Sequence, residues 1–183
     1  DLMQALYGRN GEAPVPVIAA KSSTDCFETA VEACRIAVKY RTPVIMLSDG
    51  YLANGAEPWR LPDVDSLPDI SVEFITATNH TDPDGRAVYW PYLRDPDTLA
   101  RPWALPGTPG LQHRIGGIEK HDGDGNISYQ PDNHEHMVRL RQEKVDRIAA
   151  DIAGVELDEE EGAELLVVGW GSTWGAITAG VRR

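Results

Sequence analysis

Cysteine is scarce in this sequence: the 183 residues contain only Cys26 and Cys34. Two cysteines cannot build a disulfide framework, and they are too few to hold a four-cysteine iron–sulfur cluster within this chain. Such a composition is typical of the reducing cytoplasm. Both residues lie on the apolar stripe of an expected helix, so we expect them to pack in the core; a reactive thiol is the alternative.

Basic residues and long apolar runs are also in short supply. Seventeen Lys and Arg residues face 29 Asp and Glu residues, and the formal net charge is −12. A chain this acidic repels phosphate backbones, which argues against nucleic-acid binding. No apolar run approaches 18 residues, so we expect no transmembrane helix and no membrane partner. The chain starts without a methionine or a signal peptide, and we therefore expect a fragment or a processed chain.

The first third of the chain has the pattern of an α/β protein. Residues 15–20 and 44–47 are short apolar runs that predict strands, and residues 24–40 between them predict a helix. A strand, a helix and a second strand in this order form the unit of a parallel sheet. The expected apolar stripe of the helix comprises Phe27, Ala30, Val31, Cys34 and Val38.

The middle of the chain is rich in proline and has no sustained hydrophobic period. Nine of the 13 prolines lie between Pro58 and Pro109, and only residues 72–76 predict a strand there. The aromatic content of residues 79–117 argues against disorder. Because a long ordered loop is usually functional or packs on a neighbour, we expect an arm that lies over a partner or another domain.

Regular patterning returns near the end of the chain. Residues 133–152 predict an amphipathic helix. Its expected inner face comprises Met137, Leu140, Lys144, Val145, Ile148 and Ile152. Residues 151–164 contain seven acidic residues and no Lys or Arg, which indicates a solvated linker; an acidic docking site is the alternative. Residues 165–168 predict a buried strand, and the helix after it is expected to open a second α/β domain.

Two motifs have both a chemical and a structural interpretation. The glycines of residues 169–175 lie between a strand and a helix, where they could contact a phosphate, but a tight turn needs glycine for its backbone alone. Ser48-Asp49-Gly50, with Asn79 some thirty residues later, is similar to the magnesium diphosphate motif of thiamine enzymes. A turn or helix cap is the structural alternative, and we expect no metal ligand here or at the second Gly-Asp-Gly, residues 123–125.

Metal sites are also not favoured around the start of the last long helix. Residues 122–133 begin like a calcium loop, but Ile127 stands where glycine is required and Asn133 where glutamate is required. His134 and His136 are two residues apart and therefore do not share a helix face. We expect a single histidine to contact a carboxylate or a loop carbonyl. No nucleophile–base arrangement emerges, so the residues alone support part of an α/β protein with an interaction arm.

Several blocks of sequence occur in unbroken order along nearly the whole chain. The most specific contains G-x-E-x-x-D, at residues 117–122, and P-x-x-H-x-x-M, at residues 131–137. The others are residues 1–9, 43–59, 92–110 and 167–172. Together these blocks resemble the alpha subunit of 2-oxoacid:ferredoxin oxidoreductases, and they are most similar to the 2-oxoglutarate branch.

The resemblance implies an oxidoreductase that depends on thiamine diphosphate. In such an enzyme a 2-oxoacid loses carbon dioxide, the acyl group passes to coenzyme A, and electrons pass through iron–sulfur chemistry to ferredoxin. The resemblance further implies that the beta subunit holds the diphosphate, the magnesium ion and the cluster. We therefore expect no catalytic residue, no metal ligand and no bound cofactor in this fragment alone.

The resemblance also divides the chain and selects three polar residues. The implied parts are the later half of a pyrimidine-facing α/β domain (residues 1–62), its extended arm and helix (63–153), an acidic linker (154–161) and the start of a transketolase-C-terminal-like domain (162–183). Glu119, Asp122 and His134 are the best-matched polar positions. We expect them to form a hydrogen-bonded turn that fixes the arm; a contact with coenzyme A or a partner is the alternative.

Two functions from other classes stay open beside the oxidoreductase subunit. One is a non-catalytic assembly module that uses the aromatic arm and the acidic linker for contacts within a complex. The other is a nucleotide-binding α/β enzyme that uses the turn at residues 169–175.

Overall fold

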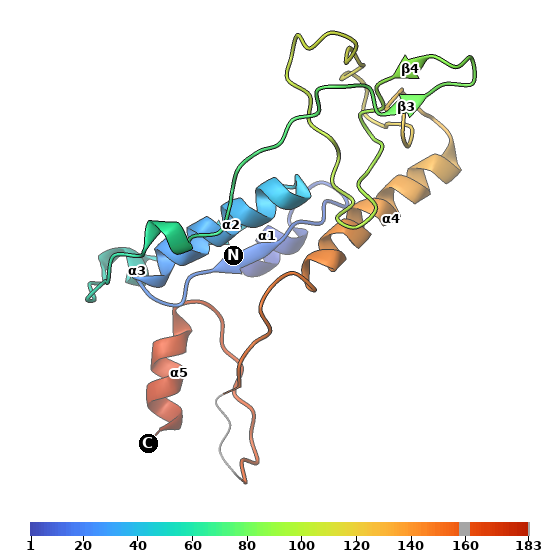
Figure 1. Ribbon diagram of the computed structural model, residues 1–183. Helices are drawn as coiled ribbons and strands as arrows, with labels where there is room; N and C mark the ends of the chain where they lie inside the picture. Colours follow the sequence, from blue (N-terminus) through green and yellow to red (C-terminus); the bar gives the residue numbers. More distant parts are fainter. Residues whose placement is uncertain (158–161, 183) are drawn as a thin grey trace.

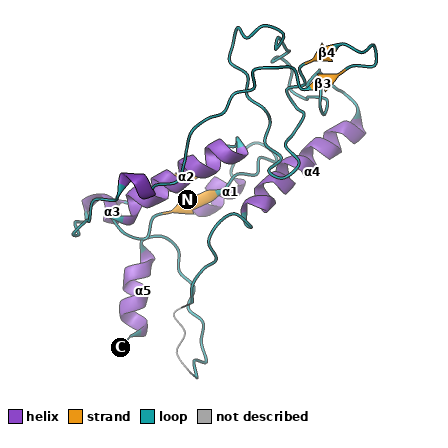
Figure 2. Cartoon of the chain, viewed as in Figure 1, coloured by secondary structure: helices purple, strands orange, loops and turns teal. Residues whose placement is uncertain are grey.

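The computed structural model describes residues 1–157 and 162–182. Figure 1 shows an α/β unit, residues 1–54, from which a long arm, residues 63–130, projects away. A long helix returns from the far end of the arm toward the α/β unit, and Figure 2 shows that most of the arm is loop. The chain therefore has two regions of different character.

The α/β unit is built around one parallel strand pair. Strand β1 (Val17–Ala19) pairs with β2 (Ile45–Leu47), and Val17 lies opposite Ile45. Helix α2 (Asp25–Tyr40) forms the crossover between them, while α1 (Leu2–Tyr7) precedes β1 and α3 (Gly50–Asn54) follows β2. The strand–helix–strand prediction is confirmed.

The buried face of α2 differs from the predicted stripe. Ile36 and Tyr40 are 1% and 4% exposed, and they pack with Ile148 of the long helix. Cys34, which was expected in the core, is exposed, and so is Ala30. That part of the prediction is wrong. Helix α2 is apolar on more than one side, and packing against the long helix selects the side that carries Ile36.

The long helix α4 (Pro131–Ile148) begins two residues before the expected start. Proline suits this first position because its ring presets the helical backbone angle and no N–H is needed there. Met137 and Ile148 are buried, as expected for the inner face. Ile152 is 46% exposed, because the helix ends before it. Its assignment to the inner face is therefore wrong.

The arm contains little regular structure. Strands β3 (His80–Thr81) and β4 (Ala87–Val88) form a short antiparallel hairpin, and a single 3-10 turn, η1, spans Val64–Ser66. The strand expected at residues 72–76 does not form. Only an isolated bridge is present, in which the N–H of Ile75 donates to the carbonyl of Trp103 at 2.8 Å. Pro102 precedes Trp103 and has no N–H to extend a ladder.

The last part of the chain forms a helix but not the expected strand. Residues 163–170 have no strand structure, and the side chains of Leu165 and Val168 are 80% and 82% exposed. The predicted strand is wrong here because no other strand among residues 1–157 and 162–182 pairs with it. Helix α5 (Thr173–Val181) follows. Of the predicted acidic linker, residues 158–161 lie outside the described residues.

None of the helices that the structure describes is both long enough and apolar enough to cross a membrane.

Candidate functional site at the carboxyl edge of the parallel strands

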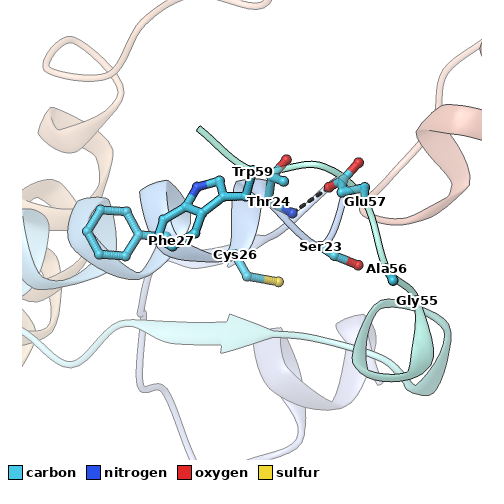
Figure 3. A pocket seen from close by; sticks show the side chains of 8 residues that line it. All are labelled: Ser23, Thr24, Cys26, Phe27, Gly55, Ala56, Glu57 and Trp59. Carbon is cyan, nitrogen blue, oxygen red and sulfur yellow. Dashed lines mark hydrogen bonds between the residues drawn. The ribbon is translucent and has the colours of Figure 1, made fainter. Parts of the chain in front are cut away.

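An open pocket of about 390 Å³ lies where α2 begins (Figure 3). Two chain segments line it: the first residues of α2 with the turn before it, and the segment that follows α3. Ligands of parallel α/β proteins bind at this edge of the sheet, so the pocket is the default candidate site. Its lining residues are Ser23, Thr24, Cys26, Phe27, Gly55, Ala56, Glu57 and Trp59.

One wall of the pocket is aromatic. The ring centroids of Phe27 and Trp59 are 5.6 Å apart, and the rings are tilted by 53°. Trp59 is 48% exposed, so a large apolar surface is open to contact. A flat organic ring is the kind of group that such a wall accommodates.

The opposite, polar side of the pocket is formed by Glu57 and the start of α2. The backbone N–H of Thr24 donates to the Glu57 carboxylate at 2.5 Å, the contact drawn in Figure 3. The Ser22 hydroxyl and the Thr24 N–H hold the pKa of Glu57 below its usual range. The chain thus places its own carboxylate at the positive end of α2.

Asp49 lies after β2 and caps α3. Its carboxylate accepts from the backbone N–H of Leu52 at 3.0 Å and from the Ser172 hydroxyl, and these contacts hold its pKa below the usual range. Asn79 instead bonds to the backbone of Trp90, with its amide donating at 3.0 Å and accepting at 2.7 Å. The helix-cap interpretation of Ser48-Asp49-Gly50 is confirmed, and the polar atoms of the Asn79 side chain bond to Trp90 rather than to Asp49.

Among residues 1–157 and 162–182, no three His, Cys, Asp or Glu side chains are grouped closely enough to hold a metal ion.

The glycine turn at residues 169–175 is explained by its backbone. Gly171 has φ +57°, and an added Cβ would lie 3.4 Å from the Cβ of Ala19 at the end of β1. The Thr173 hydroxyl donates to the Trp170 carbonyl at 2.7 Å and closes the turn. The structural interpretation of this motif accounts for Gly171 and for Gly169, where an added Cβ would overlap the Ile177 side chain, whereas at Gly175 an added Cβ would meet nothing within 4 Å.

Of the three polar residues selected from the sequence, Glu119 and His134 contact each other and Asp122 contacts His136, all away from the pocket lining. The imidazole Nδ1 of His134 is 2.5 Å from the Glu119 carboxylate, and Nε2 of His136 is 3.1 Å from the Asp122 carboxylate. Both contacts join the end of the arm to the first two turns of α4. We name these two contacts the histidine latch.

Asn133 completes this junction, and sequence reasoning missed it. Its side chain accepts from the backbone N–H of Asp122 at 3.0 Å and donates to the carbonyl of Lys120 at 2.8 Å. The turn between them is tight, because Gly123 has φ +78° and an added Cβ would lie 2.7 Å from the Trp90 ring. This geometry supports a hydrogen-bonded turn at Glu119, Asp122 and His134.

The pocket residues themselves were not anticipated. The sequence places Phe27 on the helix stripe, but nothing in its spacing brings Glu57 and Trp59 to the start of α2. The available signal was the position of both segments directly after predicted strands, since the carboxyl ends of parallel strands meet at one edge.

Comparison with known proteins identifies relatives along the whole chain. Residues 1–130 match the family described as "Pyruvate flavodoxin/ferredoxin oxidoreductase, thiamine diP-bdg". The 2-oxoglutarate oxidoreductase subunit KorA of Mycobacterium tuberculosis is 57% identical over all of this chain. The 2-oxoglutarate synthase subunit KorA of Methanothermobacter marburgensis is 24% identical, also over all of it.

A solved structure has a similar fold. It is the 2-oxoglutarate:ferredoxin oxidoreductase of Magnetococcus marinus with 2-oxoglutarate, coenzyme A and succinyl-CoA bound, which superimposes with a TM-score of 0.78 at 30% identity. This chain spans 27% of the M. tuberculosis relative, 46% of the M. marburgensis relative and 30% of the M. marinus chain. The family match covers well over half of the residues, and the chain therefore belongs to the thiamine diphosphate-binding pyruvate flavodoxin/ferredoxin oxidoreductase family.

Proposed function

We propose that this chain is part of the alpha subunit of a 2-oxoglutarate:ferredoxin oxidoreductase. The observation that carries the proposal is the 57% identity to a 2-oxoglutarate oxidoreductase subunit along the whole chain. The balanced reaction converts a 2-oxoacid, coenzyme A and two oxidised ferredoxins to an acyl-CoA, carbon dioxide, two reduced ferredoxins and a proton. Each ferredoxin accepts one electron, and the carbon–carbon bond to the carboxylate is the bond that breaks.

The residues present fit only one part of thiamine diphosphate. The aromatic wall of Phe27 and Trp59 suits an organic ring, whereas the carboxylate of Glu57 already lies at the start of α2 and repels a diphosphate. The part of the chain that the structure describes also offers no grouped set of metal ligands. We infer that the pocket contributes a wall beside the cofactor, which supplies the electron sink for decarboxylation when bound. No catalytic residue is assigned to this chain.

The remaining parts of the site follow from this proposal. The magnesium ion, the diphosphate contacts and the iron–sulfur cluster belong to a beta subunit, and ferredoxin is the electron acceptor. Residues 1–62 form the later half of the pyrimidine-facing domain, residues 63–153 its arm and helix, residues 154–161 a linker, and residues 162–183 the start of a transketolase-C-terminal-like domain. The two unpaired cysteines suit the reducing cytoplasm.

The test uses the full-length subunit assembled with its beta subunit. We expect ferredoxin reduction that requires both 2-oxoglutarate and coenzyme A, and slower reduction with pyruvate. Phe27→Ala removes half of the aromatic wall and should lower kcat/KM by roughly tenfold. Phe74→Ala is the matched control, because Phe74 is the only other phenylalanine and lies 42% exposed in the arm.

Failure of the assembled complex to reduce ferredoxin with any 2-oxoacid would contradict the proposed reaction. Equal activities of the Phe27 and Phe74 variants would instead contradict only the role of the pocket.

A further inference from the structure

Three basic side chains, Arg94, Arg101 and Lys144, gather where the arm returns to α4, and the charges of both arginines act on Lys144. The guanidinium groups of Arg94 and Arg101 lie 6.0 and 4.3 Å from the centroid of the same ring, that of Tyr92. Lys144 is 9% exposed, and its Nζ donates to the carbonyl of Arg41 at 3.3 Å. Arg147, one turn further along α4, donates to the carbonyls of Pro96 and Asp97 and holds the same arm loop in place. Hydrogen bonds from α4 to the end of α2 and to the arm therefore hold the elements that carry the cluster.

None of these three residues, nor the neighbouring Arg41, takes part in an ion pair with any residue that the structure describes. The carboxylate of Asp122, whose charge acts on Arg94, contacts His136 instead. Arg41 bonds to the backbone carbonyl of Glu73 rather than to its carboxylate. Although the chain has 29 acidic residues, none of those within residues 1–157 and 162–182 forms an ion pair with the cluster.

Some of its donors are also unused. The Nε of Arg94 is buried without a hydrogen-bond partner in the described part of the chain, while its Nη1 donates to the carbonyl of Leu99 at 3.1 Å. The half-buried guanidinium of Arg101 stacks on the Tyr92 ring, 4.3 Å from its centroid. Within residues 1–157 and 162–182 it makes no hydrogen bond, so its fork of donors is free to bind.

Unpaired buried cations are costly, and the costs are visible in Lys144. Burial, followed by the charges of Arg94 and Arg101, lowers the pKa of Lys144 to about 8. Buried charges in proteins are normally paired. A bound anion would supply the missing counter-charge and would use the free donors of Arg101 and Arg94.

We propose that Arg94, Arg101 and Lys144 form a binding site for a phosphate group of a small-molecule ligand, which enters from the side of Arg101. A phosphate ester carries up to two negative charges and three acceptor oxygens, which match three clustered cations better than a single carboxylate does. Arginine forks bind phosphate through two parallel hydrogen bonds, and Lys144 adds a buried point charge. The proposal is argued from this cluster, and its test rests on the proposed function only in using the assembled thiamine enzyme.

The experiment measures binding of inorganic pyrophosphate to the assembled full-length enzyme, already loaded with thiamine diphosphate, by calorimetry at constant ionic strength. Arg101→Met keeps the aliphatic stem but removes the donor fork, and we expect it to weaken this binding by about tenfold or more. Lys144→Met removes the buried charge and should weaken it by a similar factor. Arg86→Met is the control, because Arg86 lies in the β3–β4 hairpin with its side chain 75% exposed.

Three outcomes decide the proposal. Weaker binding in both cluster variants, with wild-type binding in Arg86→Met, supports it. Wild-type enzyme that binds no pyrophosphate beyond the thiamine site, or an Arg101→Met variant that binds as tightly as wild type, overturns it. Hydrogen exchange of α4 shows whether either variant is misfolded, and succinate in place of pyrophosphate shows whether a carboxylate competes for the same cations.

Discussion

The α/β unit and the arm are held together by different interactions. Helix α2 of the α/β unit packs on the long helix α4 through Ile36, Tyr40 and Ile148, which are almost fully buried. In the arm, polar side chains bond to nearby backbone groups. The Asp95 carboxylate, for example, accepts from the N–H of Asp97 at 3.1 Å and from the N–H and hydroxyl of Thr98 at 2.7 and 2.8 Å.

This difference shows how a long proline-rich segment keeps a defined path. Each backbone group removed from water needs a partner, and side chains of Asn and Asp provide one where no ladder is possible. The α/β unit is stabilised by the burial of apolar side chains, whereas local hydrogen bonds fix the backbone conformation of the arm. The two regions should therefore respond differently to substitution.

The largest expected effect is in the apolar core. Ile36→Ala leaves a cavity beside Tyr40 and Ile148 and should cost about 2–5 kcal/mol. Hydrogen exchange of α2 and α4 in the full-length subunit should accelerate by roughly a hundredfold or more. The matched control is Ile152→Ala, because Ile152 is 46% exposed and its truncation should cost less than about 1 kcal/mol. Equal hydrogen-exchange rates in the two variants would contradict the expectation that the buried contact between α2 and α4 stabilises the α/β unit.

A smaller and more local effect is expected in the arm. Asn79→Ala removes both hydrogen bonds to the Trp90 backbone and should cost about 1–3 kcal/mol. Limited proteolysis should show faster cleavage in the arm while exchange of α2 stays unchanged. Asn10→Ala, a substitution of the same kind outside the arm, serves as the control. Faster exchange throughout α2 would show that the arm and the α/β unit unfold together.

The smallest effect is expected at the histidine latch. The side chain of His134 is 60% exposed, so its contact with Glu119 is largely screened by solvent. A double-mutant cycle with His134→Gln and Glu119→Gln should give a coupling free energy below about 1 kcal/mol. A coupling of about 3 kcal/mol would mean that this junction, rather than the local bonds of Asn79 and Asp95, holds the arm in place.

The parts of the fold that were predictable have strong local signals. The apolar runs around β1 and β2, with an amphipathic helix between them, allow only a parallel crossover unit. The tight turn of Gly123 and Gly125 is equally clear from its composition. By contrast, residues 165–168 have the composition of a strand but no strand beside them in the described chain, and a strand forms only by pairing.

The candidate site was only partly predictable for a related reason. Glu119 and His134 were selected from a sequence resemblance, and the structure brings them together at 2.5 Å. The pocket formed by Glu57 and Trp59 with the start of α2 joins residues about thirty positions apart. Their meeting depends on the path of the segment after α3, which has no hydrophobic period to read.

The amino-acid sequence by itself determined the β1–α2–β2 unit, the long helix α4 and the family of the chain, because hydrophobic period and motif order are local properties. Only the tertiary structure decided which side of α2 is buried, since that helix is apolar on more than one side and α4 selects Ile36 and Tyr40. It also decided that Arg94, Arg101 and Lys144 lie together without an ion pair to any residue that the structure describes. Such a grouping depends on how the arm folds back on α4. The packing of the arm on the helix, rather than the spacing of these residues in the sequence, decides which side chains become neighbours.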